Sequence, residues 1–423
     1  MIFYKTKRMN DEDVHYACEK GDLNGLRRCV YDAGMGVTQE DDVGTTPMLI
    51  ACQGGHFEIV KWLYENGAAT DVMRADNDGV TPMLSACQKG HFKIVKWLYE
   101  NGAATDVTQA DNSGITPLWV ACENGHLEIV KWLHANGAAM DVTRARNDGI
   151  TPMFIACWYG RHEIIKWLHA HGTSTRERDG HGRALMFVAC IEGHLEIIQW
   201  LHTNGAAMDV TQQTNDGNTP MSIACQNGHF MIVQWLYANG AATDVARPNN
   251  QGATPMLSAC QKGHFKIVKW LYENGAANDV TRPTNKGSTP MLSVCQGGHL
   301  DIVKWLYEHG ADVMRQDNSG VTPLEEACRL DHIDIVDMLI SKGHPPTGDI
   351  ARSYNMLNFQ SRTLLYEHAT FVRNDHEGFV VFMFYVKRET NLPLDVLKYI
   401  VREFLCGNVR SMVLWQDILT PRI

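Results

Sequence analysis

The stretch TPMLIACQGGHFEIVKWLYENGAATDV, residues 46–72, decides the fold of this 423-residue chain. Its initial threonine is a favourable N-cap, Pro47 suits the first helical position, and Gly55 suits the left-handed residue that ends a helix. These residues predict a first helix over 47–54. An apolar stripe at helical spacing between Phe57 and Glu65 predicts a second helix. The stretch therefore predicts two short helices joined by a tight turn.

This pattern repeats along most of the chain. Asn-Asp-Gly and Asn-Ser-Gly tips lie between the copies and favour tight hairpin turns. A degenerate copy begins at Ala184, and an earlier copy ends its first helix at Ala17-Cys18, so we expect ten units over residues 13–343. A single unit cannot bury its own apolar face, so the units must stack as a solenoid. The Thr-Pro pairs that mark the units are Thr46-Pro47, Thr81-Pro82, Thr116-Pro117, Thr151-Pro152, Thr219-Pro220, Thr254-Pro255, Thr289-Pro290 and Thr322-Pro323.

The unit resembles the ankyrin repeat, whose motifs are T-P-L-H-x-A, G-H-x-x-I-V and L-x-x-x-G-A-D. The resemblance implies an all-α solenoid of stacked ankyrin repeats, each a helix-turn-helix with a β-hairpin loop. Most units also carry two extra residues after Gly-Ala, such as Ala69-Thr70. The histidine of T-P-L-H is replaced in the units after the first, in order, by Leu49, Leu84, Trp119, Phe154, Met186-Phe187, Ser222, Leu257, Leu292 and Glu325.

The amino-acid composition and net charge of the chain argue against several classes of function. The formal net charge is −10 without a block of lysine and arginine, which argues against nucleic acid as the main partner. The longest apolar run, residues 379–386, is too short to cross a bilayer, so we expect no membrane association. The N-terminus shows no secretory signal, and we expect a cytoplasmic location, with the nucleus as a second option.

Repeated cysteine, histidine and tryptophan residues have a structural interpretation. A cysteine followed four residues later by a histidine, as in Cys52 and His56, suggests zinc, but each unit offers two ligands and structural zinc needs four. We therefore expect no metal and no cofactor. The recurring tryptophans, such as Trp62, fit packing at repeat spacing. No catalytic motif occurs, so the chain is not expected to be an enzyme. The helix-one cysteines are Cys18, Cys52, Cys87, Cys122, Cys157, Cys190, Cys225, Cys260, Cys295 and Cys328.

The candidate binding residues lie where the repeats become irregular. The resemblance implies that partners contact the hairpin tips and the exposed end of helix one. Only one unit ends its first helix with an aromatic pair, and the hairpin that follows that unit is also unusual. Aromatic residues and arginine are enriched at interface hot spots. The alternative is a degenerate seam between duplicated blocks, because residues 81–107 and 254–280 differ at one position. The candidates are Trp119, predicted to be exposed, with Trp158, Tyr159, His181, Arg183 and Ile191.

The C-terminal segment, residues 344–423, has a different character. Consecutive prolines at Pro345-Pro346 end the periodicity, and we expect a small, mostly helical extension. One stretch resembles the opening helix of an F-box. The alternative is an amphipathic helix that packs on the last repeat. With residues 1–12 as an N-terminal tail, the chain has three parts. The residues of this docking helix are Leu392, Pro393, Leu397, Ile400 and Phe404.

These observations predict a non-catalytic scaffold that binds a partner protein on the concave face of an ankyrin solenoid. The alternative is a substrate receptor of a ubiquitin ligase, with a Skp1-like or cullin adaptor docked on the C-terminal helix.

Overall fold

The computed structural model describes residues 11–342, which form two compact units that divide after Asp244. Twenty α-helices occur in this described part, and it contains no strand. The expectation of an all-α repeat fold is confirmed. Residues 1–10 and 343–423 lie outside the described part, and with them the whole predicted docking helix.

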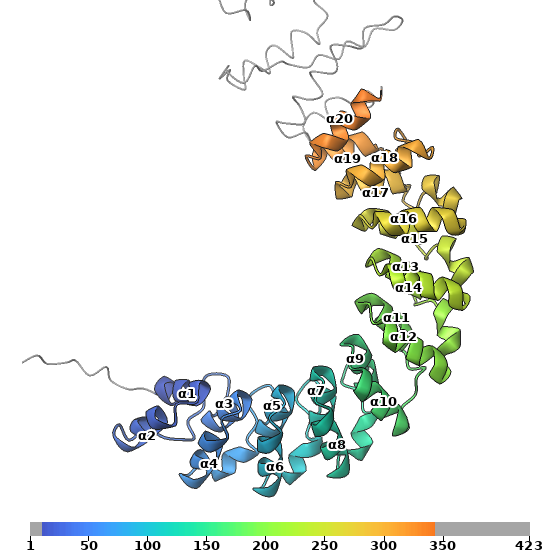
Figure 1. The fold of residues 1–423 in the computed structure, drawn as a ribbon. Helices are drawn as coiled ribbons and strands as arrows, with labels where there is room; N and C mark the ends of the chain where they lie inside the picture. The colour runs from blue at the N-terminus through green and yellow to red at the C-terminus, as the bar shows by residue number, and fades with distance from the viewer. Residues whose placement is uncertain (1–10, 343–423) are drawn as a thin grey trace, which may run out of the picture. The chain divides into compact units, whose positions relative to one another are not determined.

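Unit 1 contains seven helix pairs, and Figure 1 shows their first helices side by side in one row and their second helices in another. Neighbouring first helices contact one another in order from α1 to α13. The first helices are α1 Asp11–Lys20, α3 Pro47–Gly54, α5 Pro82–Lys89, α7 Pro117–Asn124, α9 Pro152–Trp158, α11 Leu185–Glu192 and α13 Pro220–Gln226. The second helices are α2 Leu23–Tyr31, α4 Phe57–Glu65, α6 Phe92–Glu100, α8 Leu127–Ala135, α10 His162–Ala170, α12 Leu195–Leu201 and α14 Phe230–Leu236.

Unit 2 repeats this architecture with three helix pairs. Its first helices α15, α17 and α19 contact one another in order. The pairs are α15 Pro255–Lys262 with α16 Phe265–Leu271, α17 Pro290–Gly297 with α18 Leu300–Glu308, and α19 Pro323–Arg329 with α20 Ile333–Ser341.

The two extra residues after Gly-Ala form part of short helical turns that follow most second helices. These turns occupy the long loop before most hairpins. Their bounds are η1 Ala69–Val72, η2 Ala104–Thr108, η3 Ala139–Val142, η4 His202–Ala206, η5 Ala207–Thr211, η6 Tyr237–Ala241, η7 Ala242–Ala246, η8 Tyr272–Ala276 and η9 Ala277–Thr281.

Helix ends follow the capping chemistry of the sequence. The Oγ1 atom of Thr46 accepts a hydrogen bond from the Leu49 amide at 3.2 Å, and Pro47 occupies the first position of α3. Gly55 ends α3 with a φ of 76°, a left-handed conformation that a residue with a Cβ rarely adopts. The predicted bounds 47–54 and 57–65 of this helix pair are confirmed. The one first helix after α1 that lacks a threonine cap is α11, whose N-cap residue Ala184 makes no side-chain hydrogen bond.

The core runs between the two rows of helices. The helix-one cysteines are buried, and none forms a disulfide. The tryptophans of the second helices pack edge-on against the preceding repeat, as where the rings of Tyr64 and Trp97 meet with centroids 5.1 Å apart. The structural interpretation of both residue types is confirmed.

A histidine at the start of most second helices joins the helix to the preceding repeat. In unit 1 the Nε2 atoms of these histidines lie 2.9 to 3.1 Å from a main-chain carbonyl oxygen of the preceding first helix. Because a carbonyl can only accept, the ring nitrogen donates. The pairs are His56 with Glu19, His91 with Gln53, His126 with Gln88, His194 with Trp158 and His229 with Ile191.

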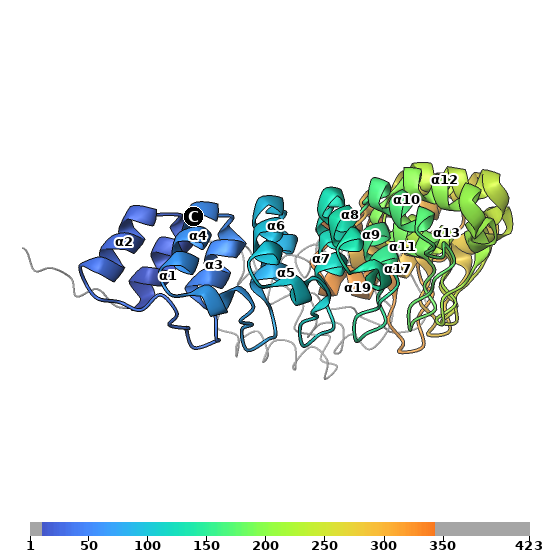
Figure 2. The ribbon, with the colours of Figure 1, turned by 90° about the horizontal axis from the view of Figure 1, so that it is seen from below.

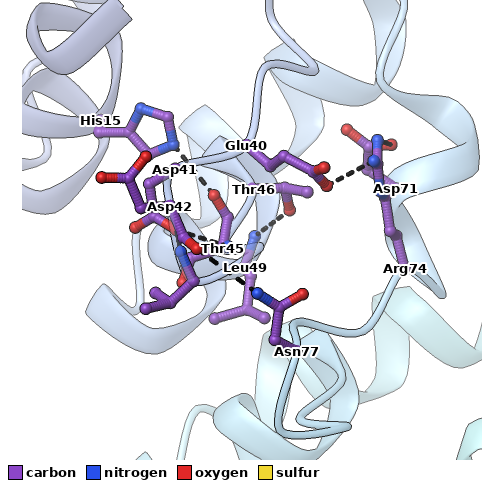
Figure 3. A network of polar contacts seen from close by, with 11 residues as sticks. His15, Glu40, Asp41, Asp42, Thr45, Thr46, Leu49, Asp71, Arg74 and Asn77 are labelled. Carbon is purple, nitrogen blue, oxygen red and sulfur yellow. Dashed lines mark hydrogen bonds and ion pairs between the residues drawn. The ribbon is translucent and has the colours of Figure 1, made fainter.

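The hairpins project on one side of the helical layers (Figure 2). They are tight turns rather than strand pairs, apart from one isolated bridge between Arg178 and Ala184. Figure 3 shows the first junction, where the Asp41 carboxylate accepts the amides of Val43 and Thr45, and the Asn77 side chain of the next hairpin reaches the Asp42 carbonyl oxygen. At this junction the Asn77 side chain thus joins one hairpin to the next.

Two helix pairs are near duplicates of one another. Residues 81–107, which contain α5 and α6, and residues 254–280, which contain α15 and α16, are identical except that Thr105 is replaced by Asn278. Thr81 and Thr254 cap the two first helices in the same way. Within residues 11–342, no helix is long and apolar enough to cross a membrane.

Candidate functional site

The irregular region of the sequence forms a patch at the end of α9, in the turn that follows this helix, and on the hairpins 146–150 and 179–183. We call it the aromatic–arginine patch and define it by Arg146, Trp158, Tyr159, Arg161 and Arg183. Thr151 begins α9 as an N-cap, and the helix ends at Trp158, followed by Gly160 with a φ of 71°. The local sequence therefore presents both aromatic residues at the end of the helix.

Trp158 and Arg183 meet in the patch. The Arg183 guanidinium lies 5.1 Å from the centre of the half-buried Trp158 ring. Its Nε atom also donates to the Asp179 carboxylate at 2.5 Å within the same hairpin. A guanidinium over an indole ring is a favourable cation–π pair. The sequence placed these two residues in the same binding region, and the structure brings them into contact.

Tyr159 is the most exposed aromatic side chain of the patch, with 48% of its surface accessible. The Arg161 guanidinium lies 6.0 Å from its ring centre. Arg161 stands where other repeats have the linking histidine, and its Nε atom donates to the Glu123 carbonyl oxygen at 2.9 Å. Arg161 therefore preserves the link between repeats and adds a cation beside Tyr159.

Sequence reasoning did not select Arg146, although a signal was available. The aligned hairpin position is aspartate in four other hairpins of unit 1, Asp41, Asp76, Asp111 and Asp179. Arg146 pairs with the Asp148 carboxylate and lies with its guanidinium 5.1 Å from the Trp119 ring centre. Nearby, burial raises the pKa of the Glu123 carboxyl, an effect that Arg146 and Arg161 oppose.

The expectation that Trp119 is exposed is wrong. Only 1% of its surface is accessible, and its Nε1–H donates to the Ile150 carbonyl oxygen at 2.9 Å. In the first repeat, His15 makes the equivalent bond from Nε2 to the Thr45 carbonyl oxygen at 3.0 Å. Trp119 therefore replaces the histidine of the ankyrin motif in both position and hydrogen bonding. Its buried ring also contacts the Arg146 guanidinium of the patch.

His181 and Ile191 lie at the margin of the patch. The His181 side chain is exposed at a hairpin tip, and its carbonyl oxygen accepts the Asn215 amide at 3.0 Å. Ile191 is half-buried near the end of α11, and its carbonyl oxygen accepts from His229 at 2.9 Å and from Asn227 at 2.8 Å. In the described part of the chain, no hydrogen bond, ion pair or ring contact joins the side chain of either residue to that of Trp158.

The buried cysteine thiols are poor nucleophiles, since burial raises the pKa of the thiols of Cys52, Cys122 and Cys157. In the described ranges, no group of three or more histidine, cysteine, aspartate or glutamate side chains could hold a metal ion. The patch itself presents aromatic, cationic and hydrogen-bonding groups.

The family model described as "Ankyrin repeats (3 copies)" matches residues 14–111, 104–179, 185–283 and 274–349. The chain belongs to the ankyrin-repeat family. Ankyrin repeats are typically non-catalytic modules of protein interaction. The stacked helix pairs of both units are thus ankyrin repeats.

Curated relatives of this ankyrin array include osteoclast-stimulating factor 1 of Bos taurus, 41% identical over 54 residues. The same protein of Rattus norvegicus and of Sus scrofa is equally similar over 54 residues. Each match covers 13% of this chain and 25% of the relative. The similarity thus spans a quarter of the length of these relatives.

Proposed function

We propose that the chain is a non-catalytic scaffold that binds a partner protein through the aromatic–arginine patch of unit 1. The observation that carries the proposal is the grouping of Trp158, Tyr159 and three arginines on repeats that are otherwise nearly uniform. Aromatic residues and arginine contribute most to protein interfaces when they lie together and exclude water.

The geometry of the patch supports this proposal. Arg183 is held by Asp179 and Arg161 by the Glu123 carbonyl oxygen, so both guanidinium groups are oriented before a partner arrives. Tyr159 lies beside Arg161, with about half its surface exposed. Preorganised side chains lose little conformational freedom on binding, which favours affinity. Elsewhere in unit 1 the equivalent ends of helix one carry no aromatic side chain, as at Gln53-Gly54 and Gln88-Lys89.

The experiment is capture of host proteins by the full chain, quantified by mass spectrometry. The double variant Trp158→Ala, Tyr159→Ala is expected to reduce recovery of specific partners by about ten-fold or more, because hot-spot side chains dominate interface energy. The variant Gln88→Ala, Lys89→Ala changes the equivalent positions of α5 and is the matched control.

Circular dichroism and thermal unfolding establish that both variants keep the repeat fold. Tyr159→Ala alone serves as a second variant, because its side chain is exposed and its loss leaves the core intact. Undiminished capture by the folded double variant would show that the irregular region is a seam between duplicated blocks and not a binding site.

A further inference from the structure

Asparagine side chains join consecutive hairpins of unit 1 in a regular ladder. Asn112 donates its amide N–H to the Asp78 carbonyl oxygen at 2.9 Å and its Nδ2 to the Asn77 carbonyl oxygen at 3.0 Å. Asn147 makes the same pair of bonds, to Ser113 and Asn112. Each junction therefore holds two inter-hairpin hydrogen bonds, one from the main chain and one from the side chain.

The ladder is interrupted once in unit 1, between the hairpins 146–150 and 179–183. The position of the asparagine is taken by Gly180, which has no side-chain donor. Between these two hairpins, as the structure describes them, no inter-hairpin bond of either kind forms. The ladder resumes immediately, because Asn215 donates to the carbonyl oxygens of His181 and Gly180 at 3.0 and 3.2 Å.

The missing side chain, and not the shorter repeat, explains the interruption. The step from Thr151 to Ala184 is two residues shorter than the usual step, and so is the step from Thr289 to Thr322 in unit 2. In that second short repeat the ladder is intact. There Asn318 donates to the carbonyl oxygens of Lys286 and Asn285, each at 3.0 Å.

The contacts between the helices at the same junction remain intact. α9 and α11 pack together, and His194 still donates to the Trp158 carbonyl oxygen at 3.0 Å. At the base of the hairpins, the Thr151 hydroxyl donates to the Glu177 carboxylate. The missing hydrogen bonds are therefore confined to the hairpin side of this junction, whereas its helices remain in contact.

We propose that the junction between hairpins 146–150 and 179–183 is the point at which unit 1 opens first. The two hairpins separate from one another there, while α9 and α11 stay in contact and act as the hinge. In a stacked array each repeat is held only by its neighbours, so the junction with the fewest bonds opens most often. The opening point borders the aromatic–arginine patch, since Arg146 and Arg183 lie on its two hairpins.

The test restores the missing side-chain hydrogen bond between the two hairpins. Gly180 does not have a positive φ, and a Cβ added there meets no atom within 4 Å, so an asparagine fits without strain. Gly180→Asn supplies the amide that Asn112 and Asn147 provide elsewhere. Gly180→Ala is the matched control, because it removes the flexibility of glycine without adding a donor.

Hydrogen–deuterium exchange of the full chain, read at single amides, reports the opening. The amides that close each hairpin are Asp76, Asp111, Arg146 and Asp179, each bonded to a carbonyl oxygen four residues later at 3.0 to 3.1 Å. In the unmodified chain we expect Arg146 and Asp179 to exchange about ten-fold faster than Asp76 and Asp111. Gly180→Asn is expected to slow these two amides to the rate of the others, and Gly180→Ala is not.

Equal exchange rates at all four amides of the unmodified chain would overturn the proposal. It would also fail if Gly180→Asn left the two rates unchanged, or if Gly180→Ala slowed them as much. The measurement requires no partner, so its result is independent of the proposed binding function.

Discussion

Individual residues carry an electrostatic cost that recurs from repeat to repeat. Asp71, Asp106, Asp141 and Asp209 occupy equivalent positions in the short helical turns, and each has a buried Oδ2 atom without a hydrogen-bond partner. Burial raises the pKa of each of these carboxyls. Arginines oppose the shift at three of them, whereas Asp106 has only the Thr105 hydroxyl at 3.4 Å. Asp106 is therefore the least compensated carboxylate of this set.

Replacing Asp106 should stabilise the protein in a pH-dependent way. Burial raises the pKa of its carboxyl to about 6 from an ordinary 3.8. A raised pKa means that the folded state binds the proton more tightly than the unfolded state. The stability that this proton contributes to the unmodified chain is complete below about pH 4 and is lost as the pH rises through about 6. Asp106→Asn is expected to increase the free energy of unfolding by about 1 to 2 kcal/mol at pH 8 and by little at pH 4. Urea unfolding at both pH values measures this.

Asp148 provides the control for that experiment. Its hydrogen bond from Arg146 holds the pKa of the Asp148 carboxyl below its usual range, the opposite direction to Asp106. Asp148→Asn should therefore give no gain in stability at pH 8. A gain of equal size in both variants would mean that the loss of net negative charge, and not burial, is responsible.

The environments of single side chains could not be predicted from the sequence as well as the bounds of the helices. The sequence predicts that Trp119 is exposed, whereas the side chain is buried. Its burial depends on a hydrogen bond to Ile150, a contact that spans 31 positions and leaves no local pattern. The pairing of Trp158 with Arg183 likewise depends on the stacking of two repeats.

At the scale of helices and turns, the local chemistry was sufficient for prediction. Helix starts follow threonine caps and helix ends follow glycines, because these residues satisfy terminal main-chain groups or adopt left-handed conformations. The hairpins were less predictable. Asparagine and glycine indicated tight turns, but the bonds between hairpins are too few to form strands and depend on neighbouring repeats.

The capping rule predicts the effect of repairing α11. Ala184 has the extended conformation of a cap residue, φ −78° and ψ 162°, close to the −89° and 160° of Thr81. Ala184→Thr is therefore expected to add a hydrogen bond to the Phe187 amide and to increase the free energy of unfolding by about 1 kcal/mol. Ala184→Val, which has the same shape without the hydroxyl, is the control in thermal unfolding, and an equal gain from valine would contradict the capping explanation.

At the scale of the whole molecule, stability is distributed over neighbouring repeats and not over a single core. The buried helix-one cysteines provide a reporter in each repeat, because a buried thiol reacts only when its repeat opens. The chain can therefore be followed repeat by repeat with a thiol reagent.

A core mutation should accordingly have a local effect. Ile129, buried in α8, can be truncated with Ile129→Ala, which we expect to accelerate labelling of Cys122 most and of Cys87 and Cys157 less. Cys18, at the start of the array, should be unaffected. Pulsed labelling followed by peptide mass spectrometry measures the four rates, and an equal acceleration at all four cysteines would show that the repeats unfold as one cooperative body.

The near-duplicate pairs α5–α6 and α15–α16 have a consequence for stoichiometry. A partner that contacted only the side chains of one such pair would meet almost the same surface again in the other unit, and one chain would then carry two molecules of it. The aromatic–arginine patch has no duplicate among the described repeats, so a partner that requires it binds once. The near-duplicate repeats would thus bind two ligand molecules per chain, whereas the irregular repeats would bind one.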